Sequence, residues 1–390
     1  MMKEANDCSS SAIPVLRPLL PDAAAIAPYL SRIDASRIYS NFGPLTREFE
    51  SRLAGLLSLP SGAVLSASCG TTALIAAILA KARHDGGKRQ LALIPSYSFV
   101  ATAIAAERCG LHPHFVDVDR DTWALDPTGL LGCPALERAA IVIAVAPFGR
   151  PLRQSEWLEF QDRTGIPVVF DAAAAFGTVG RSPEGHLGPI PSVFSFHATK
   201  SFGVGEGGCI VCDEPEHARK MLPMTNFGFD GARDSLVASI NGKMCEYVAA
   251  VGLAALDGWA HKLRSIERVA ALYRARFTDV GLADLFFGWP DVDGSCALLR
   301  CPDAAASDAL TRAFEEANIE YRRWYGEGIH RHTHFAGAER GDLRNTEAIG
   351  RNLIGIPMAP DLSEDSILRI VGAAASAIGN GRSMKRAGAA

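Results

Sequence analysis

Seven short apolar runs, separated by turn residues and alanine-rich helical segments, constrain the fold of this chain more than any other feature. The runs are bounded mostly by Gly, Pro, Asp or Ser and lie at Ala63–Ser66, Leu91–Ile94, His114–Val118, Ile141–Val145, Pro167–Phe170, Val193–Phe196 and Cys209–Cys212. Helical spacing appears at Leu45–Leu57, Thr72–Arg83 and Val100–Arg108. Strands that alternate with helices indicate an α/β domain with a mostly parallel sheet buried on both faces. Such sheets bind ligands beyond the carboxyl ends of their strands.

The pattern changes near Val251, where helical spacing becomes long. Helices are predicted over Val251–Val280 and Ala304–Asn318, with a strand at Cys296–Cys301 between them. A last helix is predicted to begin after Ser363, a suitable N-cap, and to reach Ile378. We therefore expect an N-terminal segment and large domain over residues 1–250, a smaller α+β domain over 251–378, and a disordered tail over 379–390.

Composition narrows the possible partners and the compartment. The chain has 390 residues, a formal net charge of −4 and no long basic run, so nucleic acid is not expected as a partner. No apolar run reaches the length of a membrane span, and the first residues lack the apolar core of a signal peptide. Nine scattered cysteines indicate reduced thiols in a cytoplasmic protein. The lone CxxC of Cys209 and Cys212 lies in a strand-like run and is not expected to bind a metal.

One lysine stands out by its context. Lys200 lies between the apolar run that ends at Phe196 and a glycine-rich turn, in the segment VFSFHATKSFGVGEGGCIVCD. A lysine at a strand end can simply extend its amine to solvent. A desolvated lysine, in contrast, loses its proton more easily and becomes a nucleophile that can form a Schiff base. The neighbouring motifs decide between these two interpretations.

Other groups after the predicted strands suggest one small ligand. Gly70 and Thr71, at the start of a helix, could bind a phosphate, although an ordinary threonine cap looks the same. Phe99 could stack on a planar ring or belong to the core. Asp171 ends an apolar strand, where a carboxylate is costly to bury without a partner, and it could also cap a helix.

Ser195, five residues before Lys200, could bind the phosphate of the molecule whose aldehyde the lysine holds. Pyridoxal 5′-phosphate (PLP) needs all of these parts: an anion site, a stacking face, a lysine for its aldehyde, and a carboxylate that keeps its ring nitrogen protonated. The sequence supplies them in order within one α/β domain. We therefore predict PLP as the cofactor.

The chain also resembles the DegT/StrS-type sugar aminotransferases, a family of fold-type-I PLP enzymes. The resemblance covers roughly Tyr39 to Ile378 and rests on the segments NFGPLTREFE, SCGTTAL, PSYSFVATA, FVDVDRDTWALDP, FDAAAAFG, FSFHATK, GEGGCIVCD, NGKMCEYVAAVGLAALD and IPMAPDLSEDSI. It implies a mixed, mostly parallel seven-stranded sheet and a homodimer with shared active sites.

The resemblance also assigns roles to individual positions. Catalysis would fall to Lys200, which binds the cofactor and moves a proton, and to Asp171, which pairs with the ring nitrogen. Cofactor contacts would come from Gly70, Thr71, Phe99, Ser195 and, across the dimer, Asn241. His330 would lie near the sugar. Asn241 could equally be a helix N-cap from its spacing alone.

Some positions depart from the family pattern. The glutamine that usually contacts the ring hydroxyl is replaced by Ala174, a frequent histidine is replaced by Phe176, and N-x-R-M reads NGKM. His330, His332 and His334 would share one face of a strand and could then bind zinc. No carboxylate or cysteine completes such a site, so we predict no metal.

The resemblance implies transfer of an amino group from L-glutamate to a nucleotide-linked keto-deoxy sugar, with dTDP as the expected nucleotide and a 4-keto-6-deoxy sugar as acceptor. Such reactions belong to deoxyamino sugar biosynthesis, including that of lipopolysaccharide O-antigen. Arg322, Arg323 and Trp324 are candidate contacts for the diphosphate or base, or else a solvated basic turn. Alternatives are amination at C-3, a sugar dehydratase, which Lys200 disfavours because that branch carries histidine there, and a non-catalytic PLP-binding regulatory protein.

Overall fold

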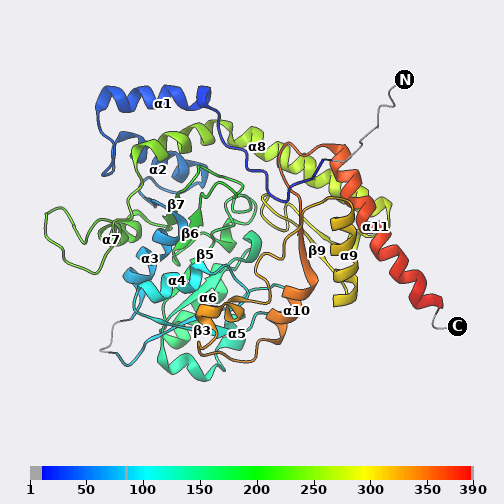
Figure 1. Cartoon of the computed structure of the whole chain (residues 1–390). Coiled ribbons are helices and arrows are strands. Elements are labelled where there is room, and N and C mark those ends of the chain that lie inside the picture. Colours follow the sequence, from blue (N-terminus) through cyan, green and yellow to red (C-terminus); the bar gives the residue numbers. More distant parts are fainter. Residues whose placement is uncertain (1–10, 84–86, 388–390) are drawn as a thin grey trace.

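A computed structural model describes residues 11–83 and 87–387 and shows a large and a small domain side by side (Figure 1). The large domain contains a seven-stranded sheet in the order β1-β7-β6-β5-β4-β2-β3. Its strands are β1 (Val64–Ala67), β2 (Leu91–Pro95), β3 (His112–Val116), β4 (Ala139–Val145), β5 (Val168–Asp171), β6 (Ser192–Ser195) and β7 (Gly208–Val211). Strand β7 runs antiparallel to both of its neighbours, and the other pairings are parallel. The predicted mixed, mostly parallel sheet is confirmed.

The period-two pattern of the strands divides the large domain into two apolar layers. In β2, Leu91 and Leu93 join one core, while Ala92 and Ile94 join the core on the opposite face. Helices cover both faces: α2 (Pro44–Leu56) and α6 (Gln154–Thr164) contribute to the first core, and α3 (Gly70–Lys81), α4 (Ala101–Arg108) and α7 (Pro215–Thr225) to the second. The short helix α5 (Pro127–Leu130) lies on the same domain, and α1 (Ala23–Ser36) packs on α8.

The small domain is the predicted α+β unit. It contains an antiparallel sheet in the order β10-β9-β8, formed by β8 (Phe286–Phe287), β9 (Ala297–Arg300) and β10 (Leu353–Ile356). Its helices are α9 (Ala304–Glu316), α10 (Arg344–Asn352) and α11 (Glu364–Ala387). Ser363 caps α11 through its Oγ, which accepts from the Ser366 N–H at 3.2 Å. The predicted disordered tail is wrong up to Ala387, because α11 continues past Ile378; residues 388–390 lie outside the described part.

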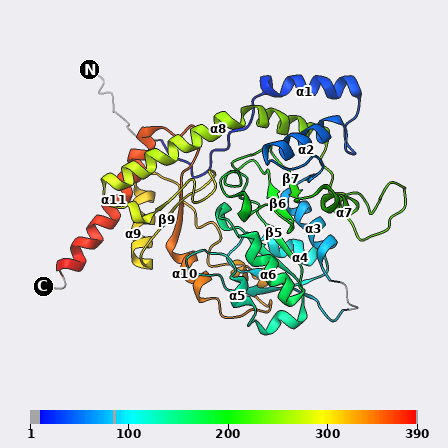
Figure 2. The same ribbon diagram turned by 180° about the vertical axis from the view of Figure 1, so that it is seen from behind.

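One helix belongs to both domains. Helix α8 (Glu246–Asp279) runs along the molecule from the large to the small domain, as Figures 1 and 2 show from opposite sides. The expected boundary between residues 250 and 251 lies inside this helix. Its packing changes further along, because Trp259 belongs to the core of the large domain and Ile266 to that of the small domain. The N-terminal strand-like segment also reaches the small domain, where Ile13 joins its core.

Across residues 11–83 and 87–387, none of the helices combines the length and the apolar character that a membrane crossing requires. The cysteines of the same ranges are all free, and Cys209 and Cys212 are buried in and beside β7. These ranges also contain no cluster of histidine, cysteine, aspartate or glutamate side chains that could hold a metal ion. His330, His332 and His334 lie on or between two short 3-10 helices, so the strand that would align them is absent from this segment.

Candidate active site

A cavity of about 730 Å³ opens at the carboxyl ends of the parallel strands, where the two domains meet. It brings together most of the residues that the sequence singles out. The lining includes Gly70, Thr71, Phe99, Asp171, Ser195, Lys200, Arg322 and Trp324. The large domain supplies the first six of these and the small domain the last two. A cavity of this size is within the usual range for a small-molecule site.

One corner of the cavity has the features of a phosphate site. Helix α3 begins there at Gly70, directly after β1, and the N–H groups of its first turn lack partners within the helix. Cys69 and Thr72 form the N-terminal cap, since the Cys69 N–H donates to the Thr72 Oγ1 at 3.1 Å. A Cβ on Gly70 would lie 2.8 Å from the Ser195 Cβ. The glycine therefore lets the helix terminus approach Ser195 closely and leaves a small cradle between them.

The carboxylate of Asp171 is buried at the end of β5. Its Oδ2 accepts a hydrogen bond from the Thr102 Oγ1 at 2.7 Å, and its Oδ1 accepts from the Ala173 N–H at 3.2 Å. Burial raises the pKa of Asp171, while these two hydrogen bonds and the charge of Lys200 act in the opposite direction. A cationic ring nitrogen beside this carboxylate would provide the charged partner that a buried anion requires.

Lys200 lies in a tight turn between β6 and β7. Its backbone N–H donates to the His197 carbonyl at 2.8 Å, and the Ala198 N–H donates to the Gly205 carbonyl at 2.7 Å. A Cβ on Gly203 would lie 2.6 Å from the Ala198 carbonyl oxygen, so this position needs glycine. The glycine-rich segment after the lysine therefore folds back against the residues before it and directs Lys200 to the cavity.

Ala174 and Phe176 differ in their surroundings. Ala174 lines the cavity and offers it no polar side chain. Phe176 points into the core, where its ring packs against those of Phe196, Phe202 and Trp259 at centroid distances of 5.4, 4.7 and 5.6 Å. Phe176 is thus a packing residue, and the cavity wall beside Asp171 is apolar at Ala174.

Sequence reasoning missed several residues at the cavity. Tyr325 lines it, with its ring stacked on Phe148 at 4.9 Å, and burial raises the pKa of Tyr325. Leu16 reaches the same cavity from the N-terminal segment. Thr102, which donates to Asp171 from behind the lining residues, had a local signal, because it lies three residues after Phe99 in a motif that was already singled out. The other residues come from distant parts of the chain.

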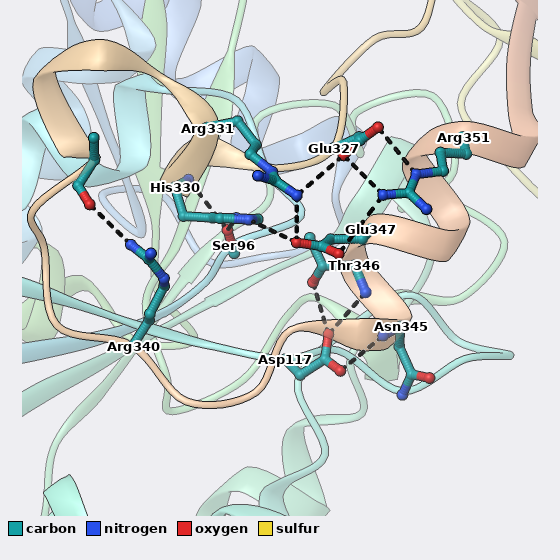
Figure 3. A network of polar contacts seen from close by, with 11 residues as sticks. Ser96, Asp117, Glu327, His330, Arg331, Arg340, Asn345, Thr346, Glu347 and Arg351 are labelled. Carbon is teal, nitrogen blue, oxygen red and sulfur yellow. Dashed lines mark hydrogen bonds and ion pairs between the residues drawn. The ribbon is translucent and has the colours of Figure 1, made fainter.

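Three predicted site residues lie outside the cavity lining. His330 is buried instead between Ser96 and α10: its Nδ1 lies 2.8 Å from the Ser96 Oγ and its Nε2 3.3 Å from the Glu347 Oε1, as Figure 3 shows. Burial lowers the pKa of His330. The expectation that His330 lies near the sugar is therefore not met within this chain.

Arg323 is likewise directed away from the cavity, because it donates to the Arg351 carbonyl and lies 3.6 Å from Asp308. The structure therefore does not bring Arg323 to the cavity where a substrate contact was expected. Asn241 is exposed, and its Oδ1 accepts from the Lys243 Nζ at 2.7 Å. The helix-cap alternative for Asn241 is excluded, since Cys245 occupies the N-cap of α8.

The fold and the cavity together define a PLP-dependent enzyme of fold type I. The residues present suit the cofactor, since a cradle that a single Cβ would fill lies at a helix N-terminus and a buried carboxylate faces the same cavity as Lys200. The chain belongs to the DegT/DnrJ/EryC1/StrS aminotransferase family, which it matches over residues 22–375. Enzymes of this family are PLP-dependent transaminases.

Individual relatives cover nearly the whole chain. Protein Mb3436c of Mycobacterium bovis is 34% identical over 93% of this chain and 89% of its own. The dTDP-4-amino-4,6-dideoxy-D-glucose transaminase of Shigella dysenteriae is 30% identical over 92% of this chain and 96% of its own. The crystal structure of DesI with its TDP-sugar product superposes with a TM-score of 0.81 at 29% identity and covers 97% of this chain and 96% of DesI.

Proposed function

We propose that this sugar aminotransferase moves an amino group from L-glutamate to a nucleotide-linked 4-keto-6-deoxy sugar, with dTDP as the nucleotide. The observation that carries the proposal is that Lys200, Asp171 and the cradle at Gly70 line one cavity. When bound there, PLP supplies an electron sink for the carbon that loses or gains the amino group. The names of the Shigella dysenteriae transaminase and of the DesI complex support a dTDP-type sugar.

Each residue would have a separate task. Lys200 would hold the cofactor's aldehyde and carry a proton, because it places an amine in the cavity that also contains Asp171. Asp171 would keep the ring nitrogen protonated. Gly70, Thr71 and Ser195 would bind the phosphate, and Phe99 would stack on the ring. Ala174 leaves the ring hydroxyl without the side-chain partner that glutamine provides in many relatives.

The far end of the cavity suits a nucleotide diphosphate. Arg322 lines it, and its guanidinium lies 5.1 Å from the centroid of the Trp324 ring, which lines the same wall. Arginine can bind two phosphate oxygens at once, and tryptophan offers a face to a base. Both side chains belong to the small domain, so the sugar nucleotide would lie between the two domains.

We also infer a homodimer with a shared site. Large apolar side chains are exposed at the cavity and elsewhere on the surface. Phe99, which lines the cavity, is 63% exposed, and Tyr39 and Tyr247 stack on each other at 6.2 Å while both remain exposed. Such a surface is suited to a second copy of the chain. Asn241 would then contact the phosphate in the partner's site. The free thiols of the described cysteines support a reducing compartment, the cytoplasm.

The test is a product assay with the purified full-length chain, PLP, L-glutamate and a panel of nucleotide-linked 3-keto and 4-keto sugars. We expect 2-oxoglutarate and a 4-amino sugar, identified by mass spectrometry and NMR. Lys200→Ala should form neither product. Amination at C-3 would favour the first alternative, and loss of a hydroxyl group without amination would favour a dehydratase. Tight PLP binding without turnover on any member of the panel would favour a regulatory protein.

A further inference from the structure

A buried carboxylate of the small domain contacts both segments that carry the candidate catalytic residues. Asp293 lies in the loop between β8 and β9 and is 1% exposed. Its Oδ2 accepts hydrogen bonds from the Gly177 N–H and the Ser201 Oγ, each at 2.8 Å. Its Oδ1 accepts from the N–H and the Oγ of Ser295, at 3.0 and 2.8 Å. Four donors therefore satisfy this carboxylate.

The large-domain partners of Asp293 lie in the segments that carry residues of the candidate site. Ser201 directly follows Lys200, and Gly177 lies six residues after Asp171 in the turns that follow β5. The backbone N–H of Asp293 also donates to the Phe148 carbonyl at 2.7 Å, and the Phe148 ring lines the cavity. One residue of the small domain is thus joined to three large-domain segments that surround the reacting groups.

The large domain is shaped to accept this side chain. A Cβ on Gly177 would lie 2.4 Å from the Asp293 Oδ2, and one on Gly149 would lie 2.9 Å from the Asp293 Cβ. Gly149 also has a φ of +83°, which disfavours other residues. Lys262 contributes a positive charge nearby, and its own Nζ donates to the Leu19 carbonyl at 2.7 Å. The two glycines leave just enough space for the Asp293 side chain, and four donors fix its carboxylate. The side chain can therefore move little without losing hydrogen bonds or clashing with the large domain.

Another carboxylate shows what a purely structural contact of this kind looks like. Asp117 joins the end of β3 to α10 by accepting from the Asn345 N–H at 2.9 Å and from the Thr346 N–H and Oγ1, both at 2.8 Å (Figure 3). It also links the two domains. Its partners do not include the Lys200 turn or the segment after Asp171. Asp117 is therefore a matched control for Asp293.

We propose that Asp293 is a positioning residue that fixes the Lys200 turn relative to the segment after Asp171 when the small domain is docked. The proposal rests on the proposed function in that Lys200 carries the cofactor. A carboxylate that binds Ser201 and Gly177 through one oxygen atom couples the two segments directly. A shift of this atom would displace Ser201, the neighbour of Lys200, relative to Gly177, and reaction geometry depends on such placement.

The experiment compares Asp293→Asn with Asp117→Asn in the full-length chain after removal of PLP. Three quantities are measured: the rate of covalent PLP attachment by visible absorbance, the pH midpoint of that absorbance, and the melting temperature. We expect attachment to slow about tenfold or more in Asp293→Asn, because an amide cannot accept from all four donors. We expect a shifted midpoint in this variant alone, although both variants lower the melting temperature.

Wild-type attachment and an unchanged midpoint in a folded Asp293→Asn variant would overturn the proposal. If Asp293→Asn does not fold, Ser201→Ala is tested in its place, because it removes one hydrogen bond and leaves three donors to Asp293. Covalent attachment of PLP to Ser201→Ala at the wild-type rate would then overturn the proposal. Lys200→Ala in the same assay separates the two ideas. If Lys200→Ala still attaches PLP covalently, both the assignment of Lys200 and the role of Asp293 are wrong. If only Asp293→Asn behaves like the wild type, the role of Asp293 is wrong and the assignment of Lys200 stands.

Discussion

The Thr102 hydroxyl donates a hydrogen bond of 2.7 Å to the Asp171 carboxylate from the first turn of α4. This bond favours the ionised form of a carboxyl group whose pKa burial raises. In the proposed function, this bond would help Asp171 to remain charged, as pairing with the ring nitrogen of PLP would require.

The first prediction is that Thr102→Val weakens catalysis most at low pH. Without the hydroxyl, the pKa of Asp171 rises further, so the ionised form is lost at a higher pH as the solution is acidified. Hydrogen bonds to charged groups contribute about 1.5–3 kcal/mol, so the acid limb of the rate profile should move up by about one unit or more. Thr102→Ser retains the donor and should restore the wild-type profile. Coincident profiles for all three proteins would contradict this role.

The second prediction concerns the cradle at the start of α3. Gly70→Ala places a methyl group 2.8 Å from the Ser195 Cβ and should weaken PLP binding by about tenfold or more, because the anion site is narrowed. Titration of the apoprotein with PLP measures this. Gly372→Ala in α11 is the control, since no atom lies within 4 Å of its added Cβ. Equal PLP affinity in the two variants would show that the phosphate lies elsewhere.

The third prediction separates two adjacent arginines. Arg322→Ala should raise KM for the sugar nucleotide about tenfold with little change in kcat, because a charge-assisted contact in the cavity is lost. Arg323→Ala should leave KM unchanged and lower the melting temperature slightly, since its partners are Arg351 and Asp308. Steady-state kinetics with saturating glutamate decide between them. The reverse pattern would place the nucleotide on the Arg323 side.

The fourth prediction concerns acid stability and one buried histidine. Burial lowers the pKa of His186 to about 4 from an ordinary value of 6.5, and a weak contact with the Gly149 backbone acts in the opposite direction. Between these values the unfolded chain binds a proton that the folded chain excludes. The free energy of unfolding should therefore fall as the pH drops from about 6.5 to about 4, by about 3 kcal/mol in total.

His186→Phe removes this titration and should make the melting temperature less dependent on pH in that window. Thermal unfolding at a series of pH values measures the effect. His332→Asn, at an exposed position, should retain the wild-type dependence. An unchanged dependence in His186→Phe would mean that other groups cause the acid sensitivity.

The fifth prediction is complementation between inactive subunits. If Asn241 contacts the partner's site, mixing Lys200→Ala with Asn241→Ala subunits gives heterodimers in which one site carries both changes and the other carries neither. Activity should then return partly, as measured after subunit exchange and sizing. An active monomer, or demonstrated heterodimers without recovered activity, would falsify the shared site.

Sequence patterns predicted the large sheet well, because its strands are continuous apolar runs with polar or glycine boundaries. All seven strands begin within two residues of their predicted starts, whereas the reversed direction of β7 was not assigned from the sequence. Local motifs singled out Gly70, Asp171, Ser195 and Lys200 before the family resemblance assigned their roles, and the structure brings all four to one cavity. Helix α1 was not predicted, since it contains Pro28 and buries Ile33 alone.

The remaining parts depend on contacts between distant residues, which local patterns do not report. Tyr325 and Leu16 enter the cavity only after the small domain and the N-terminal segment have packed against the large domain. Arg322 and Arg323 are neighbours in sequence, yet only the fold distinguishes the one that lines the cavity. His330 illustrates the same limit, because its Ser96 partner lies 234 positions earlier in the chain.

Helix α8 has a mechanical consequence for the whole molecule. Its 34 residues span roughly 50 Å at 1.5 Å per residue, and its two halves are anchored in different cores. Because α8 is continuous and packs into both cores, this connection has no loop that could act as a flexible hinge between the domains. Closure around a substrate would therefore have to bend α8 or come from loops around the cavity. A mutation that loosens packing around one half of α8 would also alter the position of the other half in the second domain.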